Sequence, residues 1–450
     1  MSVMRREERV QRAAHPVVYP AMRALARRAP VVRVPGIGVV VSDAALARRV
    51  LLDTEHFSKL GPGSPADLWT PVLGPAVLLN MEGAEHAALR RALSGLFTAR
   101  AVGELAQVEA DAALGRLAER LLQGEEVDLV REVEELAGTV ICRMTGLPPT
   151  DAAVRESFAA AREIVGLVRL HRRRLTPGQV RRARRVLGRI TARAGEAYRA
   201  GDPSTVPGRM ATLGLSESEA LGAVGAFVLT GTETIQSFVP RLVAIAADSG
   251  WLDRLLRAPR GSELRTRVVE EALRTTVPSP AMLRSVRAAT TVAGVAVRPG
   301  DRIVIATISC CRAGGPFDPG APVDPAIRHL WFGAGPHFCL GMPLALAQVD
   351  AVLDALAPVA AAGASLRVVD RRVARGVLIP AYRRLVVAVG PAVPAGSAGA
   401  AGSTGVVGST GVVGSAGQAG PADAIETADR VGDSDPSSRP SGATQPDEAA

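Results

Sequence analysis

The stretch that decides the fold reads Phe332-Gly-Ala-Gly-Pro-His-Phe-Cys-Leu-Gly341. Its glycines let the backbone turn tightly and come close to a flat ligand. A helix is expected to begin near Met342, so the Cys339 sulfur would lie beside a helix N-terminus. Backbone N–H groups and the helix dipole at such a place are expected to lower the pKa of the thiol. An iron ligand needs this environment, although a buried structural cysteine also fits Cys339 taken alone.

The decapeptide resembles the haem-ligand signature of the cytochrome P450 superfamily, Phe-x-x-Gly-x-(His/Arg)-x-Cys-x-Gly. The fixed positions are occupied by Phe332, Gly335, His337, Cys339 and Gly341. The resemblance covers about residues 30–390, because three further motifs follow in the family's order. It implies a mainly α fold with small β-sheets, the triangular helical prism that surrounds haem in that family. Residues 1–390 would form the haem domain, with Cys339 as the axial ligand of the iron in haem b.

The first further motif is Glu271-Ala-Leu-Arg274, on a helix expected over 262–275. Spacing i, i+3 puts the carboxylate and the guanidinium on one helical face. Such a pair is common and usually lies at the surface. Here its position resembles the family's buried Glu-x-x-Arg pair, which implies that it braces the core and the haem loop. The loop from Gly314 to Arg328 is shorter than the family's and carries no arginine where a third member is often supplied.

The second motif places two cationic donors, His86 and Arg90, on one face of a helix. Two such donors suit an anionic group such as a haem propionate; a solvated helix face is the alternative. The segment MEGAEHAALRR resembles the family's His-x-x-x-Arg propionate clamp. By the same resemblance, Arg287 and His337 occupy two further propionate-binding positions.

The third motif lies in a long helix predicted to begin at the capping box of Ser216 and Glu219 and to run to about Ala247. At its centre, the stretch Thr-Gly-Thr-Glu-Thr over 230–234 conflicts with helix propensity, and such conflicts tend to mark function. Threonine hydroxyls bonding back to the helix are the structural alternative. The stretch resembles the family's (Ala/Gly)-Gly-x-(Asp/Glu)-Thr oxygen-activation motif, with threonine at the first position. The resemblance implies that Thr234 hydrogen-bonds dioxygen and that Glu233 supplies protons.

Periodicity and turn residues outline the remaining elements. They predict a hairpin over 31–42, helices over about 43–200, strands over 285–308, a helix over 342–357, and strands over 366–370 and 376–388. The adjacent Cys310 and Cys311 are predicted to pack in the core from an apolar strand, and with Cys142 they match no zinc template. The resemblance implies a largely aliphatic substrate pocket, with walls from residues 61–79, 155–173, 226–234, 280–283 and 376–379.

Composition bounds the class of protein. The 450 residues include 53 basic residues, of which Lys59 is the only lysine, and 44 acidic residues. A hydrophobic content of 47% excludes a wholly disordered chain, and four cysteines make no disulfide framework. We see no signal peptide and no membrane span, so a cytoplasmic location is expected. Residues 391–450 lack aromatics and repeat GSTGVV, which predicts a disordered acidic tail.

Charge indicates the kind of partner. The tail holds seven acidic and two basic residues, which leaves 51 basic and 37 acidic residues, a formal net charge of +14, in residues 1–390. The arginine-rich stretch 169–185 is either a pair of solvated helix faces or a lid that attracts an anionic substrate or an acidic carrier protein. Nucleic acid is disfavoured because no binding motif appears and aromatics are few. No reductase pattern is present, so electrons are expected from a separate ferredoxin and ferredoxin reductase.

The resemblance implies a soluble bacterial haem-thiolate monooxygenase of specialised metabolism. It would insert one oxygen atom from O2 into a small apolar substrate, free or carrier-bound, by hydroxylation or epoxidation. A peroxide-using or non-redox member of the family, and a haem-binding protein without turnover, stay open as alternatives. The pair of Glu233 and Thr234 argues against peroxide use, whereas the short loop over 314–328 is the only hint of a protein without turnover.

Overall fold

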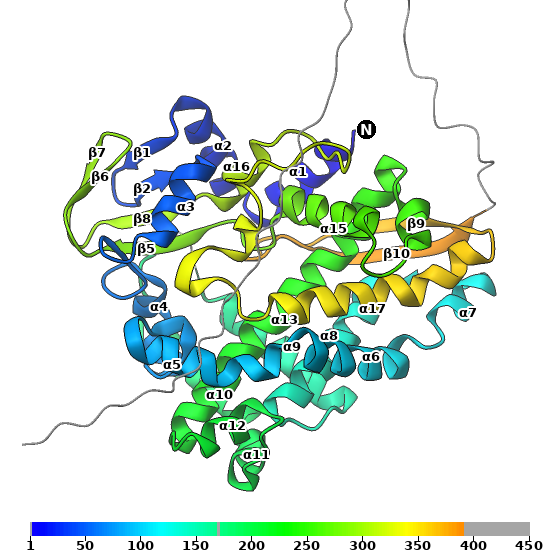
Figure 1. Ribbon diagram of the computed structural model, residues 1–450, viewed down its shortest axis with the longest axis horizontal. Helices are drawn as coiled ribbons and strands as arrows, with labels where there is room; N and C mark the ends of the chain where they lie inside the picture. The colour runs from blue at the N-terminus through cyan, green and yellow to red at the C-terminus, as the bar shows by residue number, and fades with distance from the viewer. Residues whose placement is uncertain (1, 169–171, 391–450) are drawn as a thin grey trace, which may run out of the picture. The chain divides into compact units, whose positions relative to one another are not determined.

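The computed structural model describes residues 2–168 and 172–390, and helices dominate it (Figure 1). The predicted tail 391–450 and three residues of the arginine-rich stretch, 169–171, lie outside the described residues. The helices are α1 Val3–Ala14, α2 Val18–Arg28, α3 Ala44–Leu52, α4 Pro65–Leu73, α5 Gly83–Ser94, α6 Ala99–Leu114, α7 Leu117–Leu122, α8 Leu129–Thr145, α9 Asp151–Val165, α10 Pro177–Thr191, α11 Gly195–Ala200, α12 Val206–Thr212, α13 Glu217–Ser249, α14 Leu252–Arg257, α15 Glu263–Thr276, α16 Thr307–Arg312 and α17 Met342–Ala361. Short 3-10 turns are η1 Leu78–Asn80, η2 Gly95–Phe97, η3 Ala192–Ala194, η4 Leu330–Phe332 and η5 Gly335–His337.

Three small sheets accompany the helices. Their strands are β1 Val31–Val34, β2 Gly38–Val41, β3 Phe57–Ser58, β4 Val127–Asp128, β5 Met282–Val286, β6 Thr290–Val292, β7 Val295–Val297, β8 Arg302–Ile305, β9 Ser365–Val373 and β10 Tyr382–Gly390. The largest sheet has the order β1-β2-β8-β5-β3, with β2 and β8 parallel and the other neighbours antiparallel. Strand β10 pairs with β4 and β9, and β6 pairs with β7. The predicted class, mainly helical with small sheets, is confirmed.

The predicted elements agree with the structure in most places. The hairpin over 31–42 is β1 and β2, paired in register from Val31 with Val41 to Val34 with Gly38. The predicted strand over 376–388 starts only at Tyr382, because Gly376 adopts a positive φ of 63° and Pro380 has no N–H to donate. The helix predicted over 342–357 continues to Ala361.

One prediction about the cysteines was wrong. Cys310 and Cys311 are buried in the core, as expected, but they lie on helix α16 and not in a strand. Strand β8 ends at Ile305, and the N–H of Cys310 donates to the carbonyl of Ala306, which opens a helical turn. A short apolar run does not distinguish a buried strand from a buried helix.

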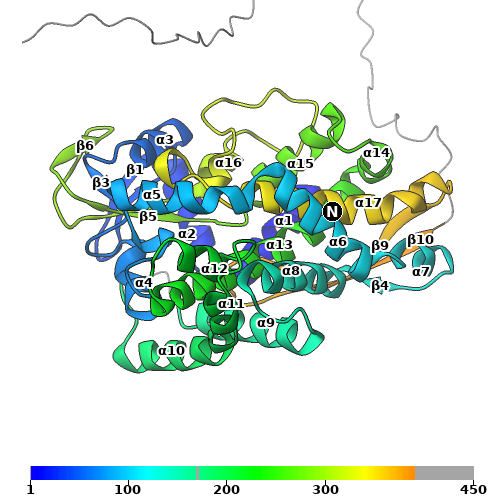
Figure 2. The same ribbon diagram turned by 60° about the horizontal axis from the view of Figure 1, so that its bottom comes forward.

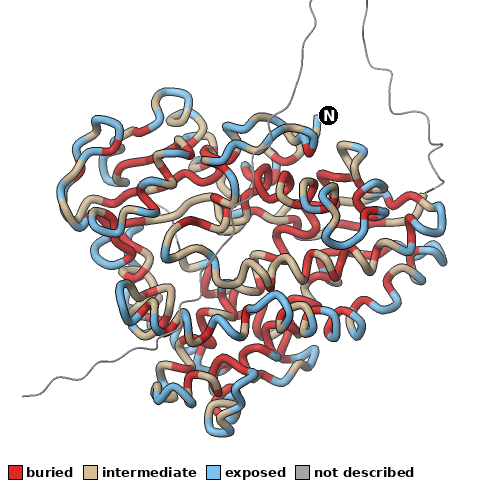
Figure 3. Tube along the Cα trace, in the orientation of Figure 1, coloured by how far each residue is buried: buried red, intermediate tan, exposed pale blue. Residues whose placement is uncertain are grey.

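Helix α13 forms the centre of the described body. Its capping box is present: Ser216 Oγ accepts from the N–H of Glu219, whose carboxylate accepts from the N–H of Ser216 at 2.8 Å. The helix passes Pro240 and ends at Gly250, which has the left-handed conformation usual for a helix C-cap. Most of its residues from Ala223 to Ala246 are buried, as the red tube in Figure 3 shows. It packs against α8, α9 and α15.

Helix α17 follows the cysteine loop and is mostly apolar. In Figures 1 and 2 it lies beside α6, and the two helices are in extensive contact. Its length and hydropathy would also suit a membrane span, and no other helix in the described ranges meets that test. Half of that apolar window is buried within the protein, as in a core helix.

Candidate active site

The cysteine loop runs from η4 through η5 to the first turn of α17. The N–H of Cys339 donates to the carbonyl of Phe332 at 2.9 Å, which closes the loop. Gly335 has a φ of 69°, and a Cβ there would lie 2.8 Å from the carbonyl oxygen of Leu51. Only glycine fits this position without displacing the backbone of α3. A Cβ on Gly341 would lie 3.8 Å from the Cys339 sulfur.

Cys339 is exposed, and its neighbours from Phe338 to Pro343 are half-buried. The N–H groups of Gly341 and Met342 act on its sulfur and lower the pKa of the thiol, as expected at a helix N-terminus. Burial by the surrounding protein outweighs these donors, and the pKa of the thiol is raised overall. The predicted direction was therefore wrong for the protein without a metal, since a coordinated cation is what deprotonates a thiol outright.

A cluster of basic side chains lies beside this loop. His86 and Arg90 come from α5 and His337 from η5, and the two imidazole rings have centroids 4.3 Å apart. Burial lowers the pKa values of His86, Arg90 and His337, and nearby cations lower those of the two histidines further. The Nδ1 atom of His337 is buried and has no hydrogen-bond partner. Two more basic groups, Lys59 and Arg284, lower the pKa of His337 by their charge.

Glu82 is the carboxylate that faces this cluster. It accepts from Ser58 Oγ at 2.5 Å, from the N–H of Lys59 and from Arg287 Nη2 at 2.8 Å. Its distance to His337 Nε2 is 3.8 Å. One carboxylate therefore faces several cationic groups, and the cluster as a whole favours an anionic ligand.

The centre of α13 supplies the candidate acid and alcohol. Thr230, Thr232 and Thr234 each donate to the carbonyl four residues earlier, at 2.8, 2.8 and 2.9 Å. The threonine hydroxyls therefore do bond back to the helix, which is the alternative to an oxygen-activating role. A Cβ on Gly231 would lie 2.3 Å from Ile141 Cδ1, so this glycine allows close packing against α8.

Glu233 is the unusual member of that stretch. Its Oε1 atom is buried and has no partner, and burial raises the pKa of the carboxyl to about 7. The charge of Arg162 lowers this pKa and that of Glu134 raises it, so both lie close enough to act on the carboxyl. A pKa near neutrality suits a group that both holds and releases protons.

The pair of Glu271 and Arg274 is buried, as the resemblance implied. It forms two hydrogen bonds of 2.7 Å. Arg274 also donates to the carbonyls of Cys311, Gly315 and Pro316, and Glu271 accepts from the N–H of Asp318 at 2.8 Å. Backbone groups of the short loop thus stand where the family often uses a third side chain.

Glu271→Gln is expected to lower the free energy of unfolding by roughly 3–5 kcal/mol, because it leaves a buried guanidinium without its charge partner. The matched control is Glu263→Gln on the same helix, whose ion pair with Arg267 is exposed at 3.6 Å. The control should cost at most about 1 kcal/mol. Urea unfolding of both variants measures the difference, and similar losses would contradict a bracing role for Glu271.

Two comparisons identify the family. A family model described as Cytochrome P450 matches residues 263–356. The erythromycin C-12 hydroxylase of Saccharopolyspora erythraea is 30% identical over 336 residues, which cover 68% of this chain and 77% of that protein. The chain belongs to the cytochrome P450 family.

Further relatives agree with this assignment. The cytochrome P-450 monooxygenase DoxA of a Streptomyces species is 28% identical over 386 residues, 76% of this chain and 86% of that protein. A mutant of P450 EryK in complex with erythromycin B superposes with a TM-score of 0.69 at 25% identity, covering 86% of this chain and 99% of that one. The P450 fold and the predicted class, a bacterial haem-thiolate monooxygenase of specialised metabolism, are confirmed.

The residues of this P450 fit a haem, with its iron and its two propionate carboxylates. The cysteine loop offers a sulfur with two N–H donors at a turn that needs glycine. The basic cluster beside it has one facing carboxylate and an unpartnered His337 Nδ1. Among residues 2–168 and 172–390, no group of three His, Cys, Asp or Glu side chains is arranged to hold a bare metal ion. A haem iron needs no such group, because the protein supplies it with an axial ligand such as one cysteine thiolate.

Sequence reasoning missed part of the basic cluster. Arg287, which it selected, follows strand β5; its side chain is 53% exposed and it pairs with Glu82. Arg284 lies within β5 and is 5% exposed, and burial lowers the pKa of its guanidinium to about 10. A charged residue inside a half-buried strand was the available signal for Arg284. For Lys59 the signal was its being the only lysine.

Proposed function

We propose that residues 1–390 form a haem b domain in which Cys339 is the axial iron ligand. The observation that carries this proposal is the cysteine loop with its N–H donors beside a basic cluster that faces one carboxylate. When bound, the haem supplies the reductive activation of O2, which a thiolate ligand favours. The protein contributes the ligand, the anchoring of the propionates and the supply of protons.

The propionates are proposed to bind His86 and Arg90 of α5 and His337 of the cysteine loop itself. Arg284 joins them, because it is buried and its charge acts on His337. Arg287 is proposed to bind at the rim and to hold Glu82 through their 2.8 Å ion pair.

Arg284→Met is expected to speed haem loss by roughly 10-fold or more, because a hydrogen bond between charged groups contributes about 1.5–3 kcal/mol. Arg287→Met should have a smaller effect, since a half-exposed ion pair contributes at most about 1 kcal/mol. Transfer of haem to excess apomyoglobin measures both rates. A larger effect for Arg287→Met would reverse the proposed order of the two arginines.

Glu233 and Thr234 are proposed to deliver protons to dioxygen. The Glu233 carboxyl is partly protonated near neutral pH, since its pKa is about 7. Gln236 Nε2 donates to Glu134 at 3.0 Å and Arg162 Nη2 donates to it at 3.1 Å. Gln236 and Glu134 thus connect the surroundings of Glu233 to Arg162, which is half-exposed at the surface. The pair of acid and alcohol favours O2-dependent turnover over peroxide use.

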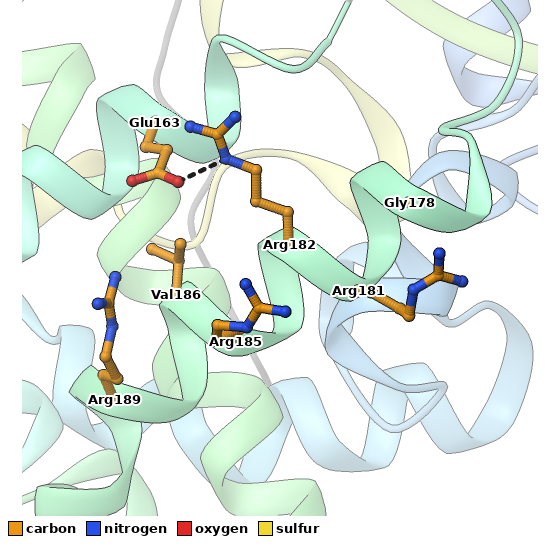
Figure 4. A pocket seen from close by; sticks show the side chains of 7 residues that line it. All are labelled: Glu163, Gly178, Arg181, Arg182, Arg185, Val186 and Arg189. Carbon is orange, nitrogen blue, oxygen red and sulfur yellow. Dashed lines mark hydrogen bonds and ion pairs between the residues drawn. The ribbon is translucent and has the colours of Figure 1, made fainter.

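The substrate is proposed to be a small apolar molecule, free or bound to a carrier protein. P450BioI, solved with a hexadec-9Z-enoic acid ligated acyl carrier protein, shares the fold with a TM-score of 0.70 at 19% identity, covering 84% of this chain and 99% of that one. Figure 4 shows Arg182, Arg185 and Arg189 along α10, with Arg182 paired to Glu163 at 2.8 Å. These side chains line a surface groove of about 520 Å³. The positive charge of its arginines suits an acidic partner.

Electrons are proposed to come from a separate ferredoxin and ferredoxin reductase in the cytoplasm. The reduced, CO-bound protein should absorb at ~450 nm, the position set by thiolate ligation. Product should then form with NAD(P)H, ferredoxin and reductase. Turnover with peroxide alone would favour the peroxide-using alternative, and the band without any turnover would favour a haem-binding protein.

A further inference from the structure

Lys59 is a buried lysine in a chain that otherwise uses arginine. It follows strand β3 and is 8% exposed. It is the only lysine among 53 basic residues. Within the described ranges, no carboxylate forms an ion pair with its ammonium group. Glu82 accepts a hydrogen bond from its backbone N–H. A buried ammonium without a charged partner is costly, so a structural reason for Lys59 is lacking.

Basic groups surround Lys59 from three other elements. Arg284 of β5 and Arg90 of α5 act on its charge, and Lys59 acts on the imidazoles of His86 and His337. Burial and these cations lower its pKa from 10.5 to about 7, against the opposing charge of Glu82. Basic groups therefore gather around Lys59 from β5, from α5 and from the cysteine loop.

The excess positive charge around Lys59 favours a ligand that carries carboxylates. Glu82 already accepts from Ser58, the Lys59 N–H and Arg287. Nδ1 of His337 is buried without a hydrogen-bond partner, and among the described residues no carboxylate pairs with the ammonium of Lys59. A ligand with two carboxylates would supply acceptors for both and would balance the excess positive charge.

We propose that Lys59 binds a haem propionate and is a further cationic anchor of the cofactor. This inference rests on the proposed haem site beside Cys339. Lys59 would donate its ammonium N–H groups to a propionate oxygen, next to the donors from His86, Arg90, Arg284 and His337. The binding of haem would then turn an unfavourable buried charge into a paired one.

The single lysine allows a direct test in the intact holoenzyme. Protein labelled with ¹³Cε-lysine gives one lysine signal, and the ferrous CO complex is diamagnetic, so NMR can follow this signal across pH. Pairing with a propionate should keep the ammonium charged, with a pKa at or above the ordinary value of 10.5. Titration near pH 7 in the holoenzyme would overturn the proposal.

Haem retention gives the second measurement. Lys59→Met should transfer haem to apomyoglobin roughly 10- to 100-fold faster than the parent protein. Lys59→Arg, which keeps the charge, should retain most of the haem affinity. The matched control is Arg100→Met, an exposed arginine that pairs with Glu104 four residues along its helix. Equal rates for Lys59→Met and this control would overturn the proposal.

The two proposals can fail separately. If the parent protein shows no CO band at ~450 nm, thiolate ligation by Cys339 fails and the haem site with it. If the band is normal while Lys59 titrates near neutrality and Lys59→Met holds haem as the parent does, the haem site stands and the role of Lys59 is wrong.

Discussion

Cys339→Ser is expected to abolish the CO band at ~450 nm and all O2-dependent product formation. A serine hydroxyl stays protonated near neutral pH and is a poor iron ligand, whereas a coordinated thiol loses its proton. The haem-to-protein ratio should also fall, because the axial ligand is lost. Difference spectra of the reduced, CO-bound protein and a pyridine haemochrome assay measure both effects.

The control for this variant is Cys142→Ser. Cys142 is buried in α8, and burial raises the pKa of its thiol to about 11, so it is a packing residue. Its replacement should reduce stability and leave the band in place. A band at ~450 nm in Cys339→Ser would show that another group ligates the iron, and the proposed function would then fall.

The cysteine loop could be predicted because its chemistry is local in sequence. Gly335, Cys339 and the start of α17 lie within a few residues, so spacing alone indicates a turn beside a helix N-terminus. The pKa of Cys339 could not be predicted in this way. Its direction depends on how much of the folded protein surrounds the sulfur, and the spacing of residues in the loop does not show this.

The basic cluster shows a second limit of sequence reasoning. His86 and Arg90 share a helical face, so their spacing predicts one site. Arg284 and Arg287 are three residues apart near a strand, where side chains alternate between faces. Spacing then indicates that the two differ, but not which one is buried. Lys59 directly follows β3, and sheet pairing brings β3 beside β5. Spacing in the sequence does not show this pairing.

The loop between α16 and η4 shows a third limit. A sequence motif can name a third side chain that hydrogen-bonds to Glu271 and Arg274. Here carbonyl and N–H groups of residues 311–318 do so. Every residue has a backbone carbonyl, so no residue type in the sequence indicates these contacts. The short loop indicated only that a third side-chain partner was missing.

Glu233→Gln is expected to slow product formation by roughly 100-fold or more, because a positioned proton donor contributes about that much. The raised pKa of about 7 sets the pH dependence. The protonated carboxyl is present below that pH and is lost above it, so turnover of the parent protein should decline as pH rises through about 7. The glutamine variant lacks this titration and should lose that limb of the profile.

A readout that needs no turnover separates this role from a merely structural one. The folded state raises the pKa of Glu233 from 4.5 to about 7, so the ionised carboxyl destabilises the folded protein. The penalty is absent below about pH 4.5, grows between the two pKa values and is complete above about 7. Glu233→Gln should therefore raise the free energy of unfolding at pH 8 by about 2–4 kcal/mol and have little effect near pH 4.5.

The matched control is Glu217→Gln, in the first turn of the same helix, where the carboxylate pairs with Arg199 at 2.9 Å and is 41% exposed. It should leave both the pH profile and the rate close to those of the parent protein. A Glu233→Gln variant with a lower rate but an unchanged pH profile would assign the titration to another group. A variant that gains stability and keeps full activity would leave Glu233 as a buried charge without a role in proton delivery.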